Sequence, residues 1–212
     1  MEGLIVHTAP QGSEAWLESR RGVITGSRFR DCRDKLKGGA PSKKCLSYAM
    51  DVARERVGGR AGDTFVNAAM RFGTEQEPFA RAAYEAKTGH FVDEAGFITT
   101  PDNKFGVSVD GLVDDDGIIE IKTMVSSDTL FRAVVDGDIS DYIDQCNGAM
   151  WLLGRKWVDL VLWAPDLDCI GRRMTIHRIV RDDNRINELE ADLMDFERTA
   201  SHYEHLLRKE AA

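Results

Sequence analysis

Two acids and a lysine, Asp110, Glu120 and Lys122, lie close together among short apolar runs. The runs flank an Asp-Asp-Asp-Gly segment at 114–117, which predicts a β-hairpin because Asp and Gly favour the tight turn between two strands. Side chains alternate along a strand, so Glu120 and Lys122 share one face, and Asp110 reaches them from the other arm. Carboxylates about 4 Å apart repel by roughly 4 kcal/mol at an effective dielectric near 20, so this group needs a proton, a cation or separation.

The donors in this group are all oxygens, which favours a hard divalent ion such as Mg²⁺, with Mn²⁺ as a substitute. The alternative is an exposed hairpin with solvated acids, in which Lys122 pairs with Glu120. Spacing alone leaves both interpretations open, because short motifs also arise by chance. An EF-hand calcium loop does not fit, since Leu112 stands where that loop needs its first acid.

The order Asp110, a turn, then Glu-Ile-Lys at 120–122 resembles the D…(D/E)-x-K signature of the PD-(D/E)xK nuclease superfamily. The surrounding residues resemble its phage lambda exonuclease branch. Its Ser-Pro-Asp-Gly-Leu pattern appears at 108–112 as Ser-Val-Asp-Gly-Leu, with Val109 in place of proline. The resemblance implies an α/β fold of the restriction-endonuclease type, with a central mixed sheet flanked by helices.

The resemblance also implies roles for single residues. Asp110, Glu120 and the carbonyl of Ile121 would hold one or two Mg²⁺ ions, which polarise a scissile phosphate and lower the pKa of a bound water. Lys122 would orient or deprotonate that water and offset negative charge on the phosphate.

Two further residues join the predicted site through the same resemblance. Glu77 ends a Gly-x-x-x-Glu pattern and Gln145 ends a Tyr-x-x-Gln pattern, and both are expected to border the metal site. Each has a structural alternative. Thr74 and Glu77 fit a helix-capping box, with Pro78 tolerated only near a helix start. Gln145 alternatively bonds backbone at the edge of an apolar helical stripe.

A second patch begins at Trp16 in a short helix and continues through Arg20 to Ser27. Thr25 or Ser27 is expected to cap the next helix, where backbone N–H groups, a hydroxyl and a guanidinium converge on a phosphate. The run is similar to the N-terminal motif of the lambda branch. This implies that Arg20 and Ser27, with Thr25 and Arg28 beside them, bind the 5'-phosphate of DNA. The alternative is a capped helix with a solvated arginine.

Charge is distributed unevenly along the chain. The net charge is −8, but residues 1–60 hold twelve Lys/Arg against seven Asp/Glu, a local +5 that leaves −13 for the remainder. A basic region attracts phosphates even when the whole protein is acidic. Within it, a loop expected at 33–44 carries five basic residues that suit either a DNA-facing flap or ordinary solvation.

The chain of 212 residues, 42% hydrophobic, is long enough for one well-buried domain, so we expect a single nuclease domain over 1–212. Its four cysteines form no C-x-x-C pair, which argues against structural zinc and predicts reduced thiols. No leader or membrane span is recognisable. We therefore expect a cytoplasmic protein of a bacterial host or prophage.

Apolar periodicity predicts the elements that position these residues. Helices are expected at 46–57, 67–87, 126–137 and 140–153, and along a heptad-like seam from Ile186 to Leu207 that packs as one helix on the sheet. Strands are expected at 91–99, 104–107, 112–113, 118–122, 157–163 and 170–179.

The function that the resemblance implies is a Mg²⁺-dependent 5'-to-3' exonuclease on double-stranded DNA. It would leave 3' single-stranded tails for a single-strand annealing partner and would assemble as a homotrimeric ring. One alternative is a restriction- or repair-type endonuclease on the same core. Another is an inactive module that binds DNA ends, against which the intact Asp110, Glu120 and Lys122 count.

Overall fold

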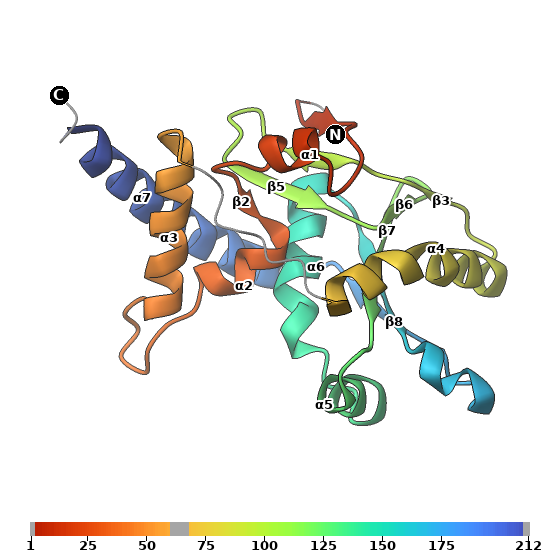
Figure 1. The fold of residues 1–212 in the computed structure, drawn as a ribbon. Helices are drawn as coiled ribbons and strands as arrows, with labels where there is room; N and C mark the ends of the chain where they lie inside the picture. Colours follow the sequence, from red (N-terminus) through yellow and green to blue (C-terminus); the bar gives the residue numbers. More distant parts are fainter. Residues whose placement is uncertain (1–2, 60–67, 210–212) are drawn as a thin grey trace.

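The computed structural model describes residues 3–59 and 68–209, and its strands form two sheets (Figure 1). The four-stranded sheet has the order β1-β4-β5-β2, made of Ile5–His7, Phe97–Thr99, Phe105–Ser108 and Ile24–Thr25. The five-stranded sheet has the order β3-β6-β7-β8-β9, made of Val92–Asp93, Gly111–Val113, Gly117–Thr123, Trp157–Trp163 and Met174–Val180. Each sheet mixes parallel and antiparallel pairs, which confirms the expected mixed α/β architecture.

The longer helices are α3 (Lys43–Arg56), α4 (Ala68–Thr88), α6 (Ser140–Leu153) and α7 (Asp183–Lys209). Of these, α4 covers one face of the five-stranded sheet and α6 covers the other. Shorter ones are α1 (Glu14–Ser19), η1 (Gly26–Arg28), α2 (Phe29–Cys32), α5 (Ser127–Leu130), η2 (Phe131–Val135) and η3 (Pro165–Ile170). All four cysteines are free thiols. Across the described ranges, no helix has the length and apolar character needed to cross a membrane.

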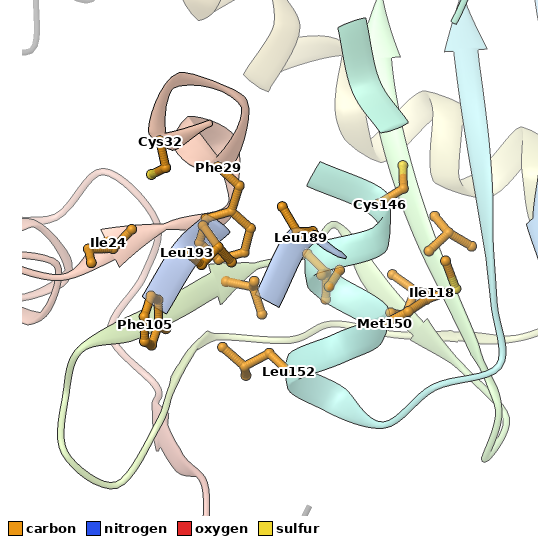
Figure 2. Close-up of a cluster of buried hydrophobic side chains, with 14 of the residues drawn as sticks. Ile24, Phe29, Cys32, Phe105, Ile118, Cys146, Met150, Leu152, Leu189 and Leu193 are labelled. Carbon is orange, nitrogen blue, oxygen red and sulfur yellow. The ribbon is translucent and has the colours of Figure 1, made fainter. Parts of the chain in front are cut away.

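Alternation along β7 divides the core into two layers. Ile118 packs with α6 and α7, around Met150, Leu189 and Leu193 (Figure 2). Ile119, next along the strand, packs on the other face with residues of α4. Because β7 is buried on both faces, its sequence reads as an almost continuous apolar run, broken by the residues that carry chemistry.

The predicted seam of α7 is confirmed over most of its length. Its apolar residues from Ile186 to Ala200 are buried, and they pack in the same cluster as α3 and α6. Leu207, the last residue of the predicted seam, is 46% exposed, so the packed stripe ends before it. α7 is one helix, as expected, but it packs mainly on α3 and α6 and not on the sheet.

Gly148 of α6 provides a test of this packing. An added Cβ there would lie 2.2 Å from Cδ2 of Phe29, which is fully buried. We expect Gly148→Ala to lower the free energy of unfolding by about 1–3 kcal/mol, measured by urea denaturation, because an overpacked core must shift. Gly73→Ala is the matched helical control, since nothing lies within 4 Å of its added Cβ. A stability loss at Gly73 equal to that at Gly148 would contradict the packing argument.

The capping box predicted at Thr74 and Glu77 is wrong. α4 runs through both residues, with Pro78 inside the helix. Thr74 donates its hydroxyl to the carbonyl of Met70 one turn earlier, and Glu77 accepts from Arg81 one turn later. Both side chains therefore bond along the helix, and neither serves a helix start.

Three other predicted boundaries differ from the structure. The strand at 91–99 is two strands, β3 and β4, in different sheets; at Gly96 between them a Cβ would lie 2.0 Å from the carbonyl oxygen of His7. The strand at 170–179 begins at Met174, because the 3-10 helix η3 occupies residues up to Ile170. The loop at 33–44 ends earlier than predicted. The hydroxyl of Ser42 caps α3 by accepting from the N–H of Cys45, which makes the next two lysines helical.

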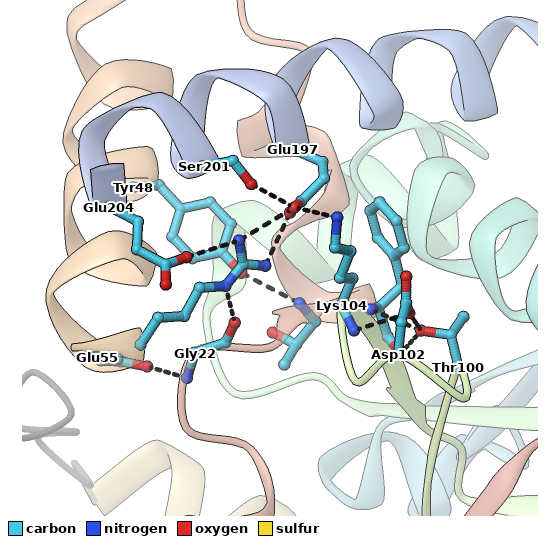
Figure 3. Close-up of polar contacts among 12 residues, drawn as sticks. Gly22, Tyr48, Glu55, Thr100, Asp102, Lys104, Glu197, Ser201 and Glu204 are labelled. Carbon is cyan, nitrogen blue, oxygen red and sulfur yellow. Dashed lines mark hydrogen bonds and ion pairs between the residues drawn. The ribbon is translucent and has the colours of Figure 1, made fainter. Parts of the chain in front are cut away.

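A buried ion-pair network joins α7 to α3 and to the turn before β5 (Figure 3). Glu197 accepts two bonds from Arg56, at 3.1 and 2.8 Å, and is 3.0 Å from the Lys104 ammonium. The Ser201 hydroxyl donates to the same carboxylate at 2.8 Å. Burial opposes ionisation of Glu197, but these donors outweigh it and hold its pKa below the usual value.

This depressed pKa gives a pH-dependent contribution to stability. The contribution is present above the unfolded-state value of about 4.3 and is lost as pH falls through the lower folded-state pKa. We expect the free energy of unfolding to fall between pH 5 and pH 3. In Glu197→Gln we expect the free energy of unfolding to be lower at pH 7 than in the wild type. We also expect it to fall less between pH 5 and pH 3. Urea denaturation of both proteins across the range measures this, and identical slopes would contradict it.

Candidate active site

Strand β7 and the residue before β6 bring the predicted acids and lysine together. The Lys122 ammonium donates to Oε1 of Glu120 at 2.7 Å. The N–H of Ile121 donates to Oδ2 of Asp110 at 2.6 Å, which ties the two arms of the hairpin. The hairpin pairing of β6 with β7 is antiparallel, as the Asp/Gly turn predicted. The solvated alternative does not hold for Glu120, whose side chain is 4% exposed.

Helix α6 contributes Gln145 to the same group. Its Nε2 donates to Oε1 of Glu120 at 2.5 Å, so one carboxylate oxygen accepts from both Gln145 and Lys122. The apolar stripe of α6 fixes this geometry, because Cys146 and Ala149 are buried against the sheet and turn Gln145 towards β7. The alternative of an edge glutamine bonded only to backbone does not hold.

The electrostatics of the group match a site built for a cation. Burial first, and then the neighbouring Glu120, raise the pKa of Asp110 well above its usual value, against the opposing Lys122 and Ile121 N–H. Burial lowers the pKa of Lys122, but Glu120 and Asp110 outweigh it and raise the pKa overall. A carboxyl group whose pKa is raised by a neighbouring carboxylate is the situation that a divalent ion relieves.

The residues present fit a hard metal ion. The predicted ligands supply two carboxylates and one backbone carbonyl, all oxygen donors of the kind Mg²⁺ prefers. Across residues 3–59 and 68–209, no three His, Cys, Asp or Glu side chains already converge as a metal site. Octahedral Mg²⁺ sites with few protein ligands usually retain several waters, so a sparse donor set is compatible with this ion.

One cavity of about 410 Å³ gathers most of the predicted site residues. Its lining includes Arg20, Ser27, Glu77, Asp110, Glu120, Ile121, Lys122 and Gln145. A second cavity of about 430 Å³ shares Glu77, Asp110 and Trp16 with it. Burial raises the pKa of Glu77, although Arg81, bonded to it at 3.0 Å, opposes the shift. The acids and the arginine patch, far apart in sequence, thus face one space.

Arg20 is held by aromatic rings. Its guanidinium carbon lies 4.3 Å from the ring centre of Trp16 and 4.9 Å from that of Phe97. Burial lowers the pKa of Arg20, but a guanidinium is not deprotonated in proteins, so the side chain keeps its positive charge. Within the described part of the chain, no hydrogen bond or ion pair to an acid engages the guanidinium. Glu55 attracts the guanidinium without forming an ion pair with it, so this half-buried, positioned cation is suited to binding an anion.

Thr25 and Arg28 do not line this cavity. The N–H of Thr25 donates to the Tyr48 hydroxyl at 3.1 Å, and the side chain of Thr25 makes no capping bond to η1. Ser27 lies inside η1 and caps no helix, so the predicted caps at both residues are wrong. Arg28 lies over the Tyr48 ring at 4.0 Å and pairs with Asp31. Packing and backbone hydrogen bonds hold the segment from Thr25 to Arg28. The residue preferences of helix caps do not detect such contacts.

Acids offset most of the basic side chains after Arg28. Arg30 pairs with Asp141, Arg33 with Asp144 and Asp192, Lys35 with Asp192, and Lys44 with Asp31. The local excess of +5 therefore overstates the positive potential of this surface, since three of these four acids come from α6 and α7 and only Asp31 lies within residues 1–60. A charge count over a sequence window does not detect partners from distant segments.

Sequence reasoning missed two contributors to the site. Phe97 completes the aromatic enclosure of Arg20, and its distance in sequence gave no signal. Arg81 holds Glu77 at one helical turn, which the i,i+4 spacing of opposite charges in α4 predicts.

The fold and the site together define a nuclease class, the lambda-exonuclease-like branch of the phage recombinase exonucleases. A family model, the YqaJ-like viral recombinase domain, matches residues 15–156. The chain belongs to that family. The match spans both the Arg20 patch and the hairpin of Asp110, and it ends just before β8.

Solved structures agree with this assignment. The chain is similar to an alkaline exonuclease from Laribacter hongkongensis, at 35% identity and a TM-score of 0.81 over 94% of this chain and 98% of the other. The same exonuclease in complex with dAMP gives the same values. A phage-related exonuclease from Haemophilus somnus 129PT shares the fold at 19% identity, with a TM-score of 0.66 over 90% of this chain and 96% of the other. A comparison with curated proteins gave no match. The family and the first relative support a DNA exonuclease.

Proposed function

We propose that this chain is a Mg²⁺-dependent 5'-to-3' exonuclease that acts on the ends of double-stranded DNA. In this proposal residues 1–212 form a single nuclease domain that acts in the cytoplasm of a bacterial host. The observation that carries it is the shared cavity, in which Arg20, which forms no ion pair with any described residue, faces the half-buried Asp110 and the buried Glu120. A terminal phosphate at the arginine would leave the next phosphodiester near the acids.

Asp110, Glu120 and the carbonyl of Ile121 are the residues that would hold the metal. When bound, Mg²⁺ would supply electrostatic stabilisation to the scissile phosphate and a lower pKa for water. Mn²⁺ is expected to substitute, because it accepts the same oxygen donors.

Lys122 would act on the reacting groups, and Gln145 would act through Glu120. Lys122, 27% exposed in its side chain, reaches the cavity with an ammonium that places positive charge beside the phosphate. As an ammonium it would orient the attacking water, and only as a neutral amine could it take the proton of that water. Gln145 would keep Glu120 in one rotamer, because its amide donates to the same oxygen as Lys122 does. Glu77 would contribute a further carboxylate from α4.

Arg20 and Ser27 would bind the terminal 5'-phosphate. A terminal phosphate carries more negative charge than an internal diester, so a half-buried guanidinium and a hydroxyl that line one cavity should prefer it. Thr25 and Arg28 would support this pocket from outside the cavity lining. Polarity then follows from geometry, since the end that fits the pocket is the end that is cut.

The experiment that tests this function compares three duplexes, with and without Mg²⁺. We expect rapid digestion of linear 5'-phosphorylated DNA, slower digestion of linear 5'-hydroxyl DNA, and no cleavage of closed circular DNA. Cleavage of the circle would favour the alternative of a restriction- or repair-type endonuclease. Binding without cleavage of any duplex would favour an inactive end-binding module.

Assembly is a further part of the proposal. The resemblance to the lambda branch suggests a homotrimeric ring, through which DNA would thread, and an annealing protein that receives the 3' tail. We expect light scattering at micromolar concentration to give three times the chain mass of 23.7 kDa. A strict monomer at that concentration would remove the ring from the proposal.

A further inference from the structure

The backbone between Arg20 and Ser27 is held from one side by helix α3. Glu55 accepts from the N–H of Gly22 at 2.9 Å, and Nε of Arg56 donates to the carbonyl of Gly22 at 2.8 Å. These contacts lie at the lower left of Figure 3. The backbone N–H and carbonyl of Gly22 are thus both hydrogen-bonded to neighbouring side chains of helix α3.

Tyr48, two turns earlier in α3, makes the next contact. Its hydroxyl accepts from the N–H of Thr25 at 3.1 Å, and its ring lies 5.1 Å from that of Phe196 of α7. Tyr48 is 6% exposed and Thr25 is 7% exposed, so this N–H has no access to bulk water. A buried backbone donor that loses its partner is destabilised, so the hydroxyl fixes the position of Thr25.

Gly22 shows how closely the turn approaches α3. Its φ is +69°, and an added Cβ would lie 2.6 Å from Cγ of Arg56 and 3.3 Å from the Arg56 backbone nitrogen. Only glycine fits this conformation and this distance. The turn therefore has one position relative to α3.

Helix α7 in turn fixes Arg56. The two bonds from Arg56 to Glu197 are bidentate, and the two side chains are 13% and 7% exposed. A planar guanidinium held at both ends has little rotational freedom. Glu197 therefore holds Arg56, Arg56 holds the turn at Gly22, and the turn positions residues that line the cavity.

We propose that Tyr48, Glu55 and Arg56 are positioning residues for the 5'-phosphate pocket, with Glu197 acting through Arg56. They make the turn from Gly22 to Thr25 rigid, so that Arg20 before it and Ser27 after it face the same cavity. The inference rests on the proposed function, because the pocket is assigned there. It adds that selectivity for a terminal phosphate depends on a helix that does not line the cavity.

Tyr48→Phe is the mildest test, because it removes one oxygen atom and keeps the ring packing. Tyr84→Phe is the matched control. Tyr84 is also fully buried, and its hydroxyl donates to Asp159 at 2.7 Å on the α4 face of the sheet. The readout is the ratio of digestion rates for 5'-phosphorylated and 5'-hydroxyl duplexes. We expect this ratio to fall about three- to tenfold in Tyr48→Phe, the effect of one hydrogen bond, and to stay unchanged in Tyr84→Phe.

Arg56→Lys gives a second variant that keeps the charge but loses the bidentate fork. We expect a similar fall in the ratio, together with faster amide hydrogen exchange in a peptide covering residues 20–28. The exchange measurement needs no activity, so it reports on the turn even if cleavage is weak. Unchanged exchange and an unchanged ratio in both Tyr48→Phe and Arg56→Lys would overturn the positioning role.

The failure of this inference and that of the proposed function are distinguishable. If the wild-type protein shows no preference for 5'-phosphorylated ends, the pocket itself is wrong and the positioning role falls with it. If Arg20→Ala removes the preference while the two α3 variants retain it, the pocket stands and the positioning role alone is overturned. An equal fall in the ratio for Tyr48→Phe and Tyr84→Phe would also overturn it, because general destabilisation would then be the cause.

Discussion

Replacing Lys122 by alanine is expected to lower the cleavage rate of 5'-phosphorylated duplex by about 10²- to 10⁴-fold, the range of general acid–base contributions. The ammonium lies 2.7 Å from Glu120 and faces the cavity, but it cannot itself ligate a metal ion. Gln145 still donates to Glu120 in the variant, so the fold should survive. Gel-based assays measure the cleavage rate, circular dichroism measures the fold, and fluorescence anisotropy measures the binding of DNA.

Lys156→Ala is the matched control for this result. Lys156 also pairs with an acid, at 2.8 Å from Asp116, but it is 70% exposed and outside the cavity lining. We expect its cleavage rate to equal that of the wild type. Near-wild-type cleavage by Lys122→Ala in Mg²⁺ would show that the assigned role of Lys122 is wrong.

Arg20→Ala is expected to slow digestion of 5'-phosphorylated ends by about ten- to a hundredfold. A charge-assisted hydrogen bond contributes roughly 1.5–3 kcal/mol, and each 1.4 kcal/mol is about tenfold in rate. The slowing on 5'-hydroxyl ends should be much smaller, because those ends never made the contact. Initial rates on the two substrates, measured side by side, give the comparison.

Arg28→Ala distinguishes a pocket specific for the terminal phosphate from a site that binds any phosphate of the DNA. Arg28 belongs to the same predicted patch, but it lies over Tyr48, pairs with Asp31 and is absent from the cavity lining. We expect its loss to change the ratio of the two rates less than the loss of Arg20 does. Equal slowing of Arg20→Ala on both substrates would contradict a pocket specific for the terminal phosphate.

The sequence predicts that Asp110, Glu120 and Lys122 lie together, and it does so because they are close along the chain. Asp110, Glu120 and Lys122 lie within thirteen residues, and a hairpin with period-two alternation fixes their relative directions. The bounds of α6 and β8 were also predicted to the residue, since their apolar stripes coincide with buried faces. Short-range patterns therefore determine the fold of the β6–β7 hairpin and of helix α6 behind it.

The rest of the site depends on contacts between distant segments. Phe97 encloses Arg20 from β4, and Tyr48 holds Thr25 from α3, although neither residue stands in a motif. The capping box failed for a related reason, because tertiary packing carries α4 through Pro78. Local rules describe what a segment prefers, and partners far along the chain decide between those preferences.

The measurement that tests the central claim most directly is strand-specific release of label from a linear duplex. One substrate carries label at the 5'-phosphate end and the other at the 3' end of the same strand. We predict that, in Mg²⁺, the 5' label is released first, and that both chelation and Lys122→Ala suppress its release. Release of the 3' label first, or equal release in the presence of a chelator, would contradict a metal-dependent 5'-to-3' exonuclease.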